Sequence, residues 1–220
     1  MDVVVNAAIS ADGKLSSRRR EQIAISGPAD FDRVDRLRAS ADAVMVGVGT
    51  VLADDPHLTL DVEDRRVQRL RAGRPGHPAR VVADSRGRTP TDARVLDDLA
   101  TTYLLVSAAA PEGRREALRE AGADIVEAGE ERVDLPAALD ALDAEGIDRL
   151  MVEGGGKLLF SLFDAGLVDE LSVYVGSTIV GGRDAPTLAD GEGFVEEFPV
   201  LSLTDVERLD DGVLLGYVVE

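Results

Sequence analysis

The stretch 150–159, LMVEGGGKLL, combines a carboxylate at Glu153 with a glycine triplet. Glycine lets a backbone approach a phosphate closely, and the first turn of a following helix presents unpaired N–H groups and a positive dipole. The pattern predicts an anion site made by Gly154, Gly155, Gly156, Lys157 and Leu158. The alternative is a tight strand-to-helix turn without a ligand. Such a turn needs no carboxylate, however, and α/β sheets bind ligands at the carboxyl ends of their strands.

A second glycine turn, Gly47–Pro56, follows another apolar strand. It lacks the third glycine and the downstream acid of a dinucleotide fingerprint. Together with the first turn it fits a cofactor that carries two phosphates. Thr50 can donate its hydroxyl to a phosphate or ribose, and Asp54 can accept from a ribose or an amide. The alternative is that these two side chains cap a helix and close an Asx-turn.

A third loop, Asp84–Arg88, also follows a strand and contains Ser85. Arg86 and Arg88 predict a grip on a 2′-phosphate, which is the group that distinguishes NADP from NAD. A solvated surface pair is the equally weighted alternative.

Lysine occurs only at Lys14 and Lys157, and both positions lie at glycine turns. In a chain that otherwise uses arginine, this placement favours a role for a compact ammonium group, although two cases can also coincide by chance. Arg36 and Arg38 lie near the end of a predicted helix, where the helix dipole alone favours arginine.

Apolar runs that alternate with amphipathic stretches predict an α/β fold with a mostly parallel sheet. The last strands, separated only by loops, predict an antiparallel end. The predicted strands are 3–9, 43–46, 80–83, 103–106, 124–126, 149–152, 169–175, 200–206 and 213–219, and the predicted helices are 28–41, 111–121, 135–145 and 156–165. Residues 61–78, rich in Arg, Gly and Pro, are expected to have little regular structure.

The composition limits the classes of function. The 220 residues carry 24 basic and 42 acidic side chains, a net charge of −18, which disfavours nucleic acid and anionic membranes as partners. With no cysteine and two histidines, the sequence predicts no metal site. Dispersed acid with little lysine indicates adaptation to high salt. We expect one domain over residues 1–220, in a cytoplasmic protein without a signal peptide or membrane span.

These motifs together resemble the riboflavin-pathway reductase family, the RibD C-terminal or stand-alone diaminopyrimidine-ribosylamino phosphate reductases. The matching stretches are 10–14, 37–39, 43–58, 81–85, 153–156 and 167–182. The resemblance implies a dihydrofolate-reductase-like fold with helices on both faces of the sheet. It also implies reduction of the ribosyl group of 2,5-diamino-6-(ribosylamino)-4(3H)-pyrimidinone 5′-phosphate. The sequence has no zinc-binding signature of a deaminase domain, and in this respect it is similar to the single-function archaeal members of the family.

The resemblance further implies a set of site residues. NADPH, or NADH as the alternative, would lie along Ile9, Thr50, Asp54, Ser85, Gly155, Gly156, Lys157 and Leu158. The substrate would contact Gln22, Arg38, Leu58 and Glu153, with Arg38 toward its 5′-phosphate. Glu153 and Lys14 are the candidate catalytic groups.

Bacterial members carry an arginine shortly after the Asp-Asp-Pro segment, where this chain has Leu58 and Thr59. The second ligand of the substrate phosphate is therefore unassigned, with Arg65 and Arg66 among the candidates. The family and the apolar run 171–175 predict a homodimer, unless that run is covered within the chain. Two rival functions are an NADP-dependent reductase of a pterin or other small heterocycle and a nucleotide-binding module without turnover.

Overall fold

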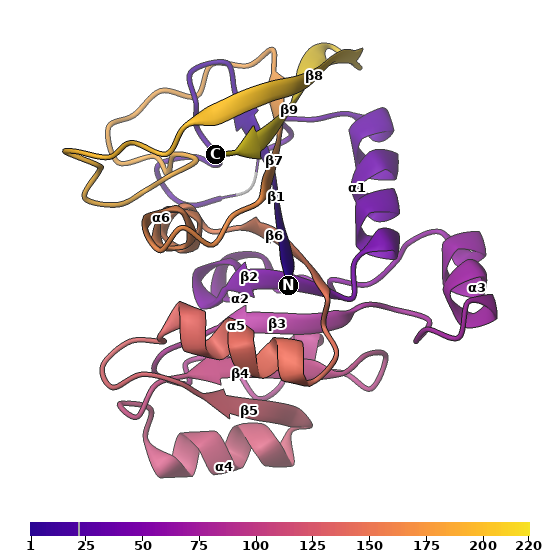
Figure 1. The fold of residues 1–220 in the computed structure, drawn as a ribbon, viewed down its shortest axis with the longest axis vertical. Helices are drawn as coiled ribbons and strands as arrows, with labels where there is room; N and C mark the ends of the chain where they lie inside the picture. Colours follow the sequence, from indigo (N-terminus) through magenta and orange to yellow (C-terminus); the bar gives the residue numbers. More distant parts are fainter. Residues whose placement is uncertain (22) are drawn as a thin grey trace. The chain divides into compact units, whose positions relative to one another are not determined.

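The computed structural model describes residues 1–21 and 23–220. The chain forms two compact units: unit 1 contains Met1 and Asp35–Met151, and unit 2 contains Asp2–Val34 and Val152–Glu220. Helix α1 (Pro28–Ser40) and strand β6 (Arg149–Gly154) contain the points where the chain passes from one unit to the other (Figure 1).

Unit 1 is built on four parallel strands in the order β5-β4-β3-β2. They are β2 (Ala43–Gly47), β3 (Ala79–Ala83), β4 (Thr102–Val106) and β5 (Ala123–Glu127). The register pairs Gly47 with Ala83 and Ala83 with Leu105. The carboxyl ends of β2, β3 and β4 therefore meet at one edge of the sheet, and the loops that follow them are neighbours.

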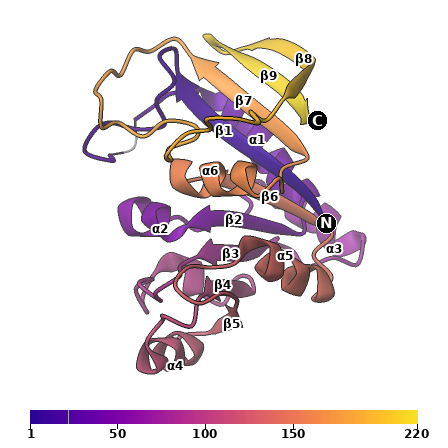
Figure 2. The ribbon, with the colours of Figure 1, turned by 60° about the vertical axis from the view of Figure 1, so that its left-hand side comes forward.

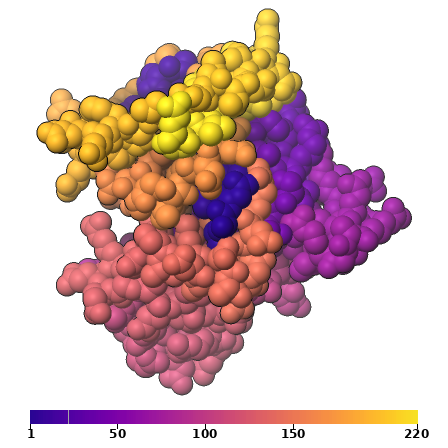
Figure 3. Space-filling view, in the orientation of Figure 1, coloured from indigo at the N-terminus to yellow at the C-terminus, as the bar shows by residue number. Residues whose placement is uncertain are grey.

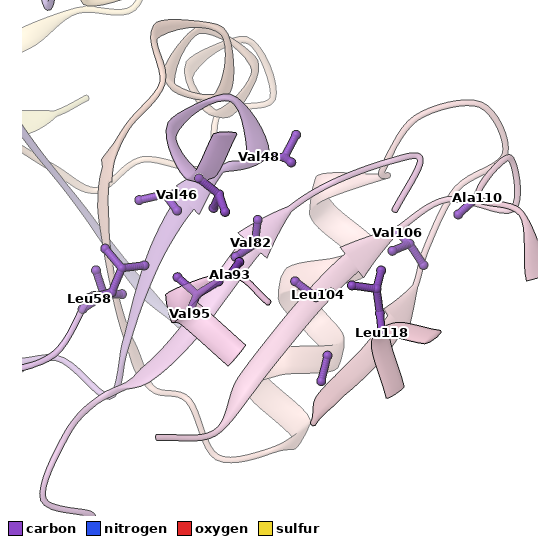
Figure 4. Close-up of a cluster of buried hydrophobic side chains, with 13 residues drawn as sticks. Val46, Val48, Leu58, Val82, Ala93, Val95, Leu104, Val106, Ala110 and Leu118 are labelled. Atoms are coloured by element: carbon purple, nitrogen blue, oxygen red, sulfur yellow. The ribbon is translucent and has the colours of Figure 1, made fainter. Parts of the chain in front are cut away.

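Both faces of this sheet are apolar, as expected for interior parallel strands. Figure 4 shows Val46, Val82 and Leu104 on one face, in a cluster with side chains from α2 (Val48–Asp54), the 3-10 helix η1 (Arg94–Leu96) and α4 (Glu112–Glu120). The preceding residue on each of two strands, Met45 on β2 and Val81 on β3, points to the opposite face and is fully buried. There α5 (Leu135–Ala144) buries the side chains Leu135, Ala138, Leu139 and Leu142.

The prediction of little structure over 61–78 is wrong, because residues 63–71 form helix α3 (Glu63–Arg71). Buried Asp35 accepts hydrogen bonds from the Asp61 and Val62 amides at 2.7 and 3.3 Å, just before the helix begins. Arg69, 4% exposed, donates to three backbone carbonyls at Ala39, Ala41 and Pro75. These contacts come from distant parts of the chain and fix a segment whose local composition resembles a loop.

Unit 2 contains β1 (Asp2–Ser10), β7 (Glu170–Gly176), β8 (Leu201–Leu209) and β9 (Gly212–Val219). Strand β7 pairs in parallel with β1 and antiparallel with β9, and β9 pairs antiparallel with β8. The predicted antiparallel end of the sheet is thus confirmed. Because β7 has a strand on each side, the run 171–175 is covered within the chain. Helix α6 (Gly156–Asp164) also belongs to this unit.

The remaining predicted strands and helices are present with boundaries within a few residues of those expected. Among the described residues, no helix is long and apolar enough to cross a bilayer.

Candidate functional site

In unit 2, a turn at the carboxyl end of β1 is tied to the loop that follows β7. The Asp12 carboxylate accepts hydrogen bonds from the Ser10 hydroxyl at 2.7 Å and from the Val180 and Gly181 amides at 3.0 and 2.7 Å. These donors, the Ser10 hydroxyl first, lower the pKa of Asp12 to about 2. The carboxylate therefore stays charged and keeps the two segments together across the neutral pH range.

Lys14 ends this turn and contacts the same loop further along. Its ammonium donates to the Ala185 carbonyl at 3.3 Å, and its backbone pairs with Thr187 in an isolated antiparallel bridge. An ammonium has three hydrogens, and the bond to the Ala185 carbonyl uses one of them. The structure thus holds Lys14, a predicted catalytic residue, in a defined position.

The glycine triplet contacts the same segment, 185–190. Gly154 and Gly155 have φ values of +139° and +76°, which side chains disfavour, and α6 begins at Gly156. The Gly156 carbonyl accepts from the Asp190 amide at 3.0 Å, and the Thr187 carbonyl lies where a Gly156 side chain would be. Figure 2 shows the loop after β7, in light orange, passing both the β1 turn and α6. Unit 2 therefore brings Lys14 and the α6 N-terminus to one segment.

The other predicted residues of unit 2 have different environments. Glu153, at the end of β6, and Ile9, in β1, are half-buried, and the Lys157 side chain is exposed. The Leu158 side chain is buried and its amide donates to the Gly155 carbonyl at 2.8 Å. A ligand at this helix end would thus meet the backbone N–H groups of the first two helical residues. Gln22 lies outside the described residues.

In unit 1, the predicted glycine turn Gly47–Pro56 is helical over most of its length, because α2 begins at Val48 directly after β2 and ends at Asp54. Thr50 is half-buried within α2. Asp54 is its last residue, and burial raises the pKa of the Asp54 carboxyl above its usual value. The adjacent Asp55 accepts from the Arg94 amide at 2.8 Å, so this second aspartate has a structural role.

The loop after β3 is held on several sides. Buried Asp84 accepts from the Thr89 amide and hydroxyl at 2.7 and 2.8 Å. Ser85 accepts at its carbonyl from the Ser107 hydroxyl at 2.8 Å, and at its own hydroxyl from the Val133 amide at 3.0 Å. The Ser85 hydroxyl hydrogen is still available to a ligand. The loop thus presents a fixed backbone beside the carboxyl end of β2.

The two arginines of this loop differ. Arg86 is exposed, whereas the Arg88 Nε lies 3.5 Å from the Asp84 Oδ1, an oxygen without a hydrogen-bond partner among the described residues. Arg114 of α4 donates to the Gly87 and Thr89 carbonyls at 2.8 and 2.7 Å. Both side chains are exposed, and Arg88 would leave Asp84 in order to turn to an incoming phosphate.

A third group of predicted residues in unit 1 contains Arg38 and Leu58. Arg38, in the last turn of α1, donates from its Nη1 to the Thr59 carbonyl at 3.2 Å. Leu58 has a φ of +55° and its side chain is in the hydrophobic core, 3% exposed. Any contact between Leu58 and a substrate would therefore involve its backbone. The structure brings Arg38 next to the segment predicted to contact the substrate.

The two candidates for a second phosphate ligand already form ion pairs. Arg65 binds buried Asp35 at 2.6 Å, and Arg66 binds Glu63 at 2.5 Å. If Arg65 moved to bind the substrate phosphate, Asp35 would lose its cation. An unpaired carboxylate is costly in a buried position.

Sequence reasoning missed the residues that hold these loops. Arg114 and the segment 185–190 have no local motif, since each acts on a loop distant in the sequence. Asp12 had a signal, because aspartate before glycine commonly bonds to nearby backbone. In residues 1–21 and 23–220, no group of three or more His, Asp or Glu side chains could hold a metal ion.

Each unit thus supplies part of the chemistry that a nucleotide and a sugar phosphate require. Unit 2 has a helix N-terminus with a lysine and a carboxylate, and unit 1 has hydroxyl, arginine and carboxyl groups on fixed loops. A glycine turn into a helix fits the phosphates of a nicotinamide dinucleotide, because the first turn of the helix offers backbone N–H groups and a positive dipole end to an anion. Gly156 itself is required by packing, since Thr187 and Asp190 occupy the space of a side chain there.

Comparison with known proteins follows this geometry. The family model for the RibD C-terminal domain matches residues 2–215. Two proteins named 2,5-diamino-6-ribosylamino-4(3H)-pyrimidinone 5′-phosphate reductase are similar over nearly their whole length. The one from Archaeoglobus fulgidus is 47% identical over 210 residues, covering 96% of this chain and 94% of that protein. The one from Methanothermobacter thermautotrophicus is 45% identical over 221 residues, covering 99% and 98%.

A solved structure of a pyrimidine reductase-like protein from Corynebacterium diphtheriae superposes with a TM-score of 0.88 at 20% identity, covering 100% of this chain and 92% of that one. This likeness concerns the fold. It confirms the predicted α/β class, with a mixed, mostly parallel sheet that ends in antiparallel strands.

Proposed function

Because the chain belongs to the RibD C-terminal domain family, we propose that it is the reductase of riboflavin biosynthesis that acts on 2,5-diamino-6-ribosylamino-4(3H)-pyrimidinone 5′-phosphate. The observation that carries the proposal is the identity of 47% and 45% to two reductases of that name over nearly the full length. Reduction converts the ribosylamino group of the substrate into a ribitylamino group.

The cofactor is a nicotinamide dinucleotide, and NADPH is the proposed form. When bound, it supplies the hydride that reduces C1′ of the opened sugar. The resemblance assigns to it Gly155 and Gly156 at the α6 N-terminus, with Ile9, Lys157 and Leu158. It also assigns Thr50, Asp54 and Ser85, and Arg86 and Arg88 are the proposed ligands of the 2′-phosphate.

The protein's own groups have separate tasks in this reaction. Glu153 would bind the sugar hydroxyls or relay a proton as the ribose ring opens. Lys14, fixed by the Ala185 carbonyl, would orient the opened chain or act as an acid. Arg38 would bind the 5′-phosphate, and Gln22 and Leu58 would contact the rest of the substrate. Together these groups would orient the opened sugar for hydride transfer.

The decisive experiment measures NADPH oxidation with the enzymatically prepared ribosylaminopyrimidine phosphate in molar KCl. We expect turnover by the native chain and a strongly raised KM in Arg38→Ala. A native chain that binds NADPH without turnover would point to another substrate, such as a pterin, which needs no Arg38. A chain that consumes no NADPH with any candidate would be a binding module, and failure to bind the cofactor would remove the reductase proposal.

Glu153→Gln separates a proton relay from simple binding. A relay predicts a large loss of kcat, because the amide cannot carry a proton. Binding of sugar hydroxyls predicts a raised KM with most of kcat kept.

A cytoplasmic homodimer is part of the proposal. The buried residues Leu171 and Val173 leave β7 unavailable, but the edge strand β8 exposes Leu203 and Val206 at 56% and 59%. Figure 3 shows β8 and β9, in yellow, at the surface. An exposed apolar edge is a common site for a second copy of a chain. Light scattering should give a dimer mass for the native chain and a monomer mass for Leu203→Asp with Val206→Asp. A native monomer would refute the dimer without affecting the reaction.

A further inference from the structure

The segment 55–62 of unit 1 is attached at nearly every residue. Its ends are fixed by the bond from the Arg94 amide to Asp55 and by the bonds from the Asp61 and Val62 amides to Asp35. Its middle, 58–60, is buried. The Thr59 carbonyl in this middle part accepts the hydrogen bond from Arg38. The segment therefore holds one nitrogen of the Arg38 guanidinium.

One histidine of the chain, His57, lies within this segment, and the other, His77, contacts it. The Leu60 amide donates to the His77 Nδ1 at 3.1 Å. His57, within the segment, lies with its Nδ1 3.5 Å from the Asp97 carboxylate. The two contacts differ at Nδ1, which must carry a hydrogen to donate to the Asp97 carboxylate and must carry none to accept from the Leu60 amide. His57 gains an ion pair when it is protonated, whereas Nδ1 of His77 can accept only when it carries no proton.

The surroundings of His77 favour its neutral form. Burial lowers the pKa of His77 first, and the positive charges of Arg66, Arg80 and Arg69 lower it further. These arginines face it from α3 and β3, and Asp97, after η1, opposes them. The neutral imidazole must carry its hydrogen on Nε2, since Nδ1 is the acceptor. Proton uptake at Nδ1 would put two N–H groups against each other and break the bond.

We propose that His77 is a positioning residue for the substrate phosphate: its neutral imidazole holds Leu60, so that the neighbouring Thr59 carbonyl orients Arg38, and protonation releases this arrangement. The proposal rests on the proposed function in one respect, the role of Arg38 as a phosphate ligand. His77 itself contacts the backbone of the segment and no reacting atom. Its loss should therefore affect substrate affinity more than the rate of the chemical step.

The experiment compares His77→Asn and His77→Ala with the native chain in NADPH oxidation from about pH 5 to 8, the range in which histidine titrates. Asn can place Oδ1 near the position of Nδ1 and does not titrate, and Ala removes the acceptor. We expect His77→Ala to raise KM about threefold to tenfold with kcat nearly unchanged, the fold-change that one hydrogen bond typically gives. His77→Asn should restore KM to near the native value at neutral pH.

The pH series separates His77 from the substrate, whose phosphate also titrates near pH 6. The ratio of the KM of the native chain to that of His77→Asn cancels the substrate's own ionisation. This ratio should rise as the pH falls below the ordinary range of histidine. His57→Asn is the matched control, because it removes the other histidine of the same segment and should keep the acid-side rise.

An NMR measurement supplies a readout independent of turnover. With two histidines in the chain, the ¹⁵N shifts of His77 can be assigned by the His57→Asn spectrum, and they should report an Nε2–H tautomer. An Nδ1–H tautomer, an unchanged KM in folded His77→Ala, or a flat KM ratio over the pH series would each overturn the proposal. A native chain without turnover would instead refute the proposed function. If His77→Ala does not fold, the KM ratio of the native chain to His77→Asn and the His77 tautomer still test the proposal.

Discussion

Gly156→Ala tests whether the segment 185–190 fixes the N-terminus of α6. An alanine Cβ at this position would lie 2.8 Å from the Asp190 Cβ and even closer to the Thr187 carbonyl oxygen. Ordinary carbon contacts are about 3.5–4.0 Å, so the segment must move by about 1 Å. The movement would break the hydrogen bond from the Asp190 amide to the Gly156 carbonyl.

The magnitude follows from these contacts. Overpacking a tight site costs about 1–3 kcal/mol, and losing one hydrogen bond costs about 1 kcal/mol. Alanine returns up to about 1 kcal/mol through its higher helix propensity. We therefore expect the free energy of unfolding to fall by about 1–3 kcal/mol in urea titrations. Because the proposed cofactor contacts lie at this turn, the Kd for NADPH should also rise, about tenfold, in a fluorescence titration.

Gly113→Ala is the matched control. Gly113 is in α4 and has nothing within 4 Å of an added Cβ, so its stability should stay the same or increase by up to about 1 kcal/mol. The argument is refuted if Gly156→Ala has the native unfolding free energy and native NADPH affinity. Loss of stability with unchanged NADPH affinity would keep the packing argument and reject the cofactor contact.

Three further predictions concern stability. The pKa of Asp12 is about 2, below its ordinary 3.8, so this carboxylate stabilises the fold above about pH 4 and the contribution is lost as the pH falls toward 2. The difference in unfolding midpoint between the native chain and Asp12→Asn should therefore shrink as the pH falls from about 4 to about 2. A constant difference would contradict this prediction. Arg69→Met should lower the unfolding free energy in urea by about 2–4 kcal/mol, because three hydrogen bonds from a buried guanidinium are lost, although the Ala41 carbonyl keeps its bond from Arg74; a loss below about 0.5 kcal/mol would show that water replaces the guanidinium. Because the net charge is −18, the thermal midpoint should rise between about 0.1 and 2 M KCl as repulsion is screened, and an unchanged midpoint would refute the proposed salt adaptation.

Elements with a clear apolar period could be predicted from the sequence. The interior strands and α1, α4, α5 and α6 have local signals, and their positions match the expectation. Helix α3 could not be predicted, because Asp35 of α1 holds the Asp61 and Val62 amides just before it and Arg69 joins it to the end of α1. Helix α2 was mistaken for a turn, since glycine is as common in tight turns as at a helix start directly after a strand.

For the candidate site, the sequence predicts which residues lie at strand ends better than it predicts which groups their side chains contact. The positions of the glycine triplet, Lys14 and the Ser85 loop at strand ends follow from the α/β pattern. The partner of each side chain does not: Arg88 faces Asp84, Lys14 faces the Ala185 carbonyl, and the Leu58 side chain enters the core. These outcomes depend on which loops pack together, which no local motif encodes.

The arginines of unit 1 also limit which sequences this fold accepts. Arg69 and Arg114 each donate to backbone carbonyls from Nε and from one Nη, and Arg80 donates from Nη1 to two carbonyls and from Nη2 to the Asp97 carboxylate. A planar guanidinium reaches such a pair from one side chain, whereas a lysine ammonium gathers its hydrogens at a single atom. Exchange for lysine, which preserves the charge, would thus lose part of the hydrogen bonding at each of the three positions. The scarcity of lysine in this protein is therefore partly architectural, and a library that recodes arginine as lysine should lose variants at these sites first.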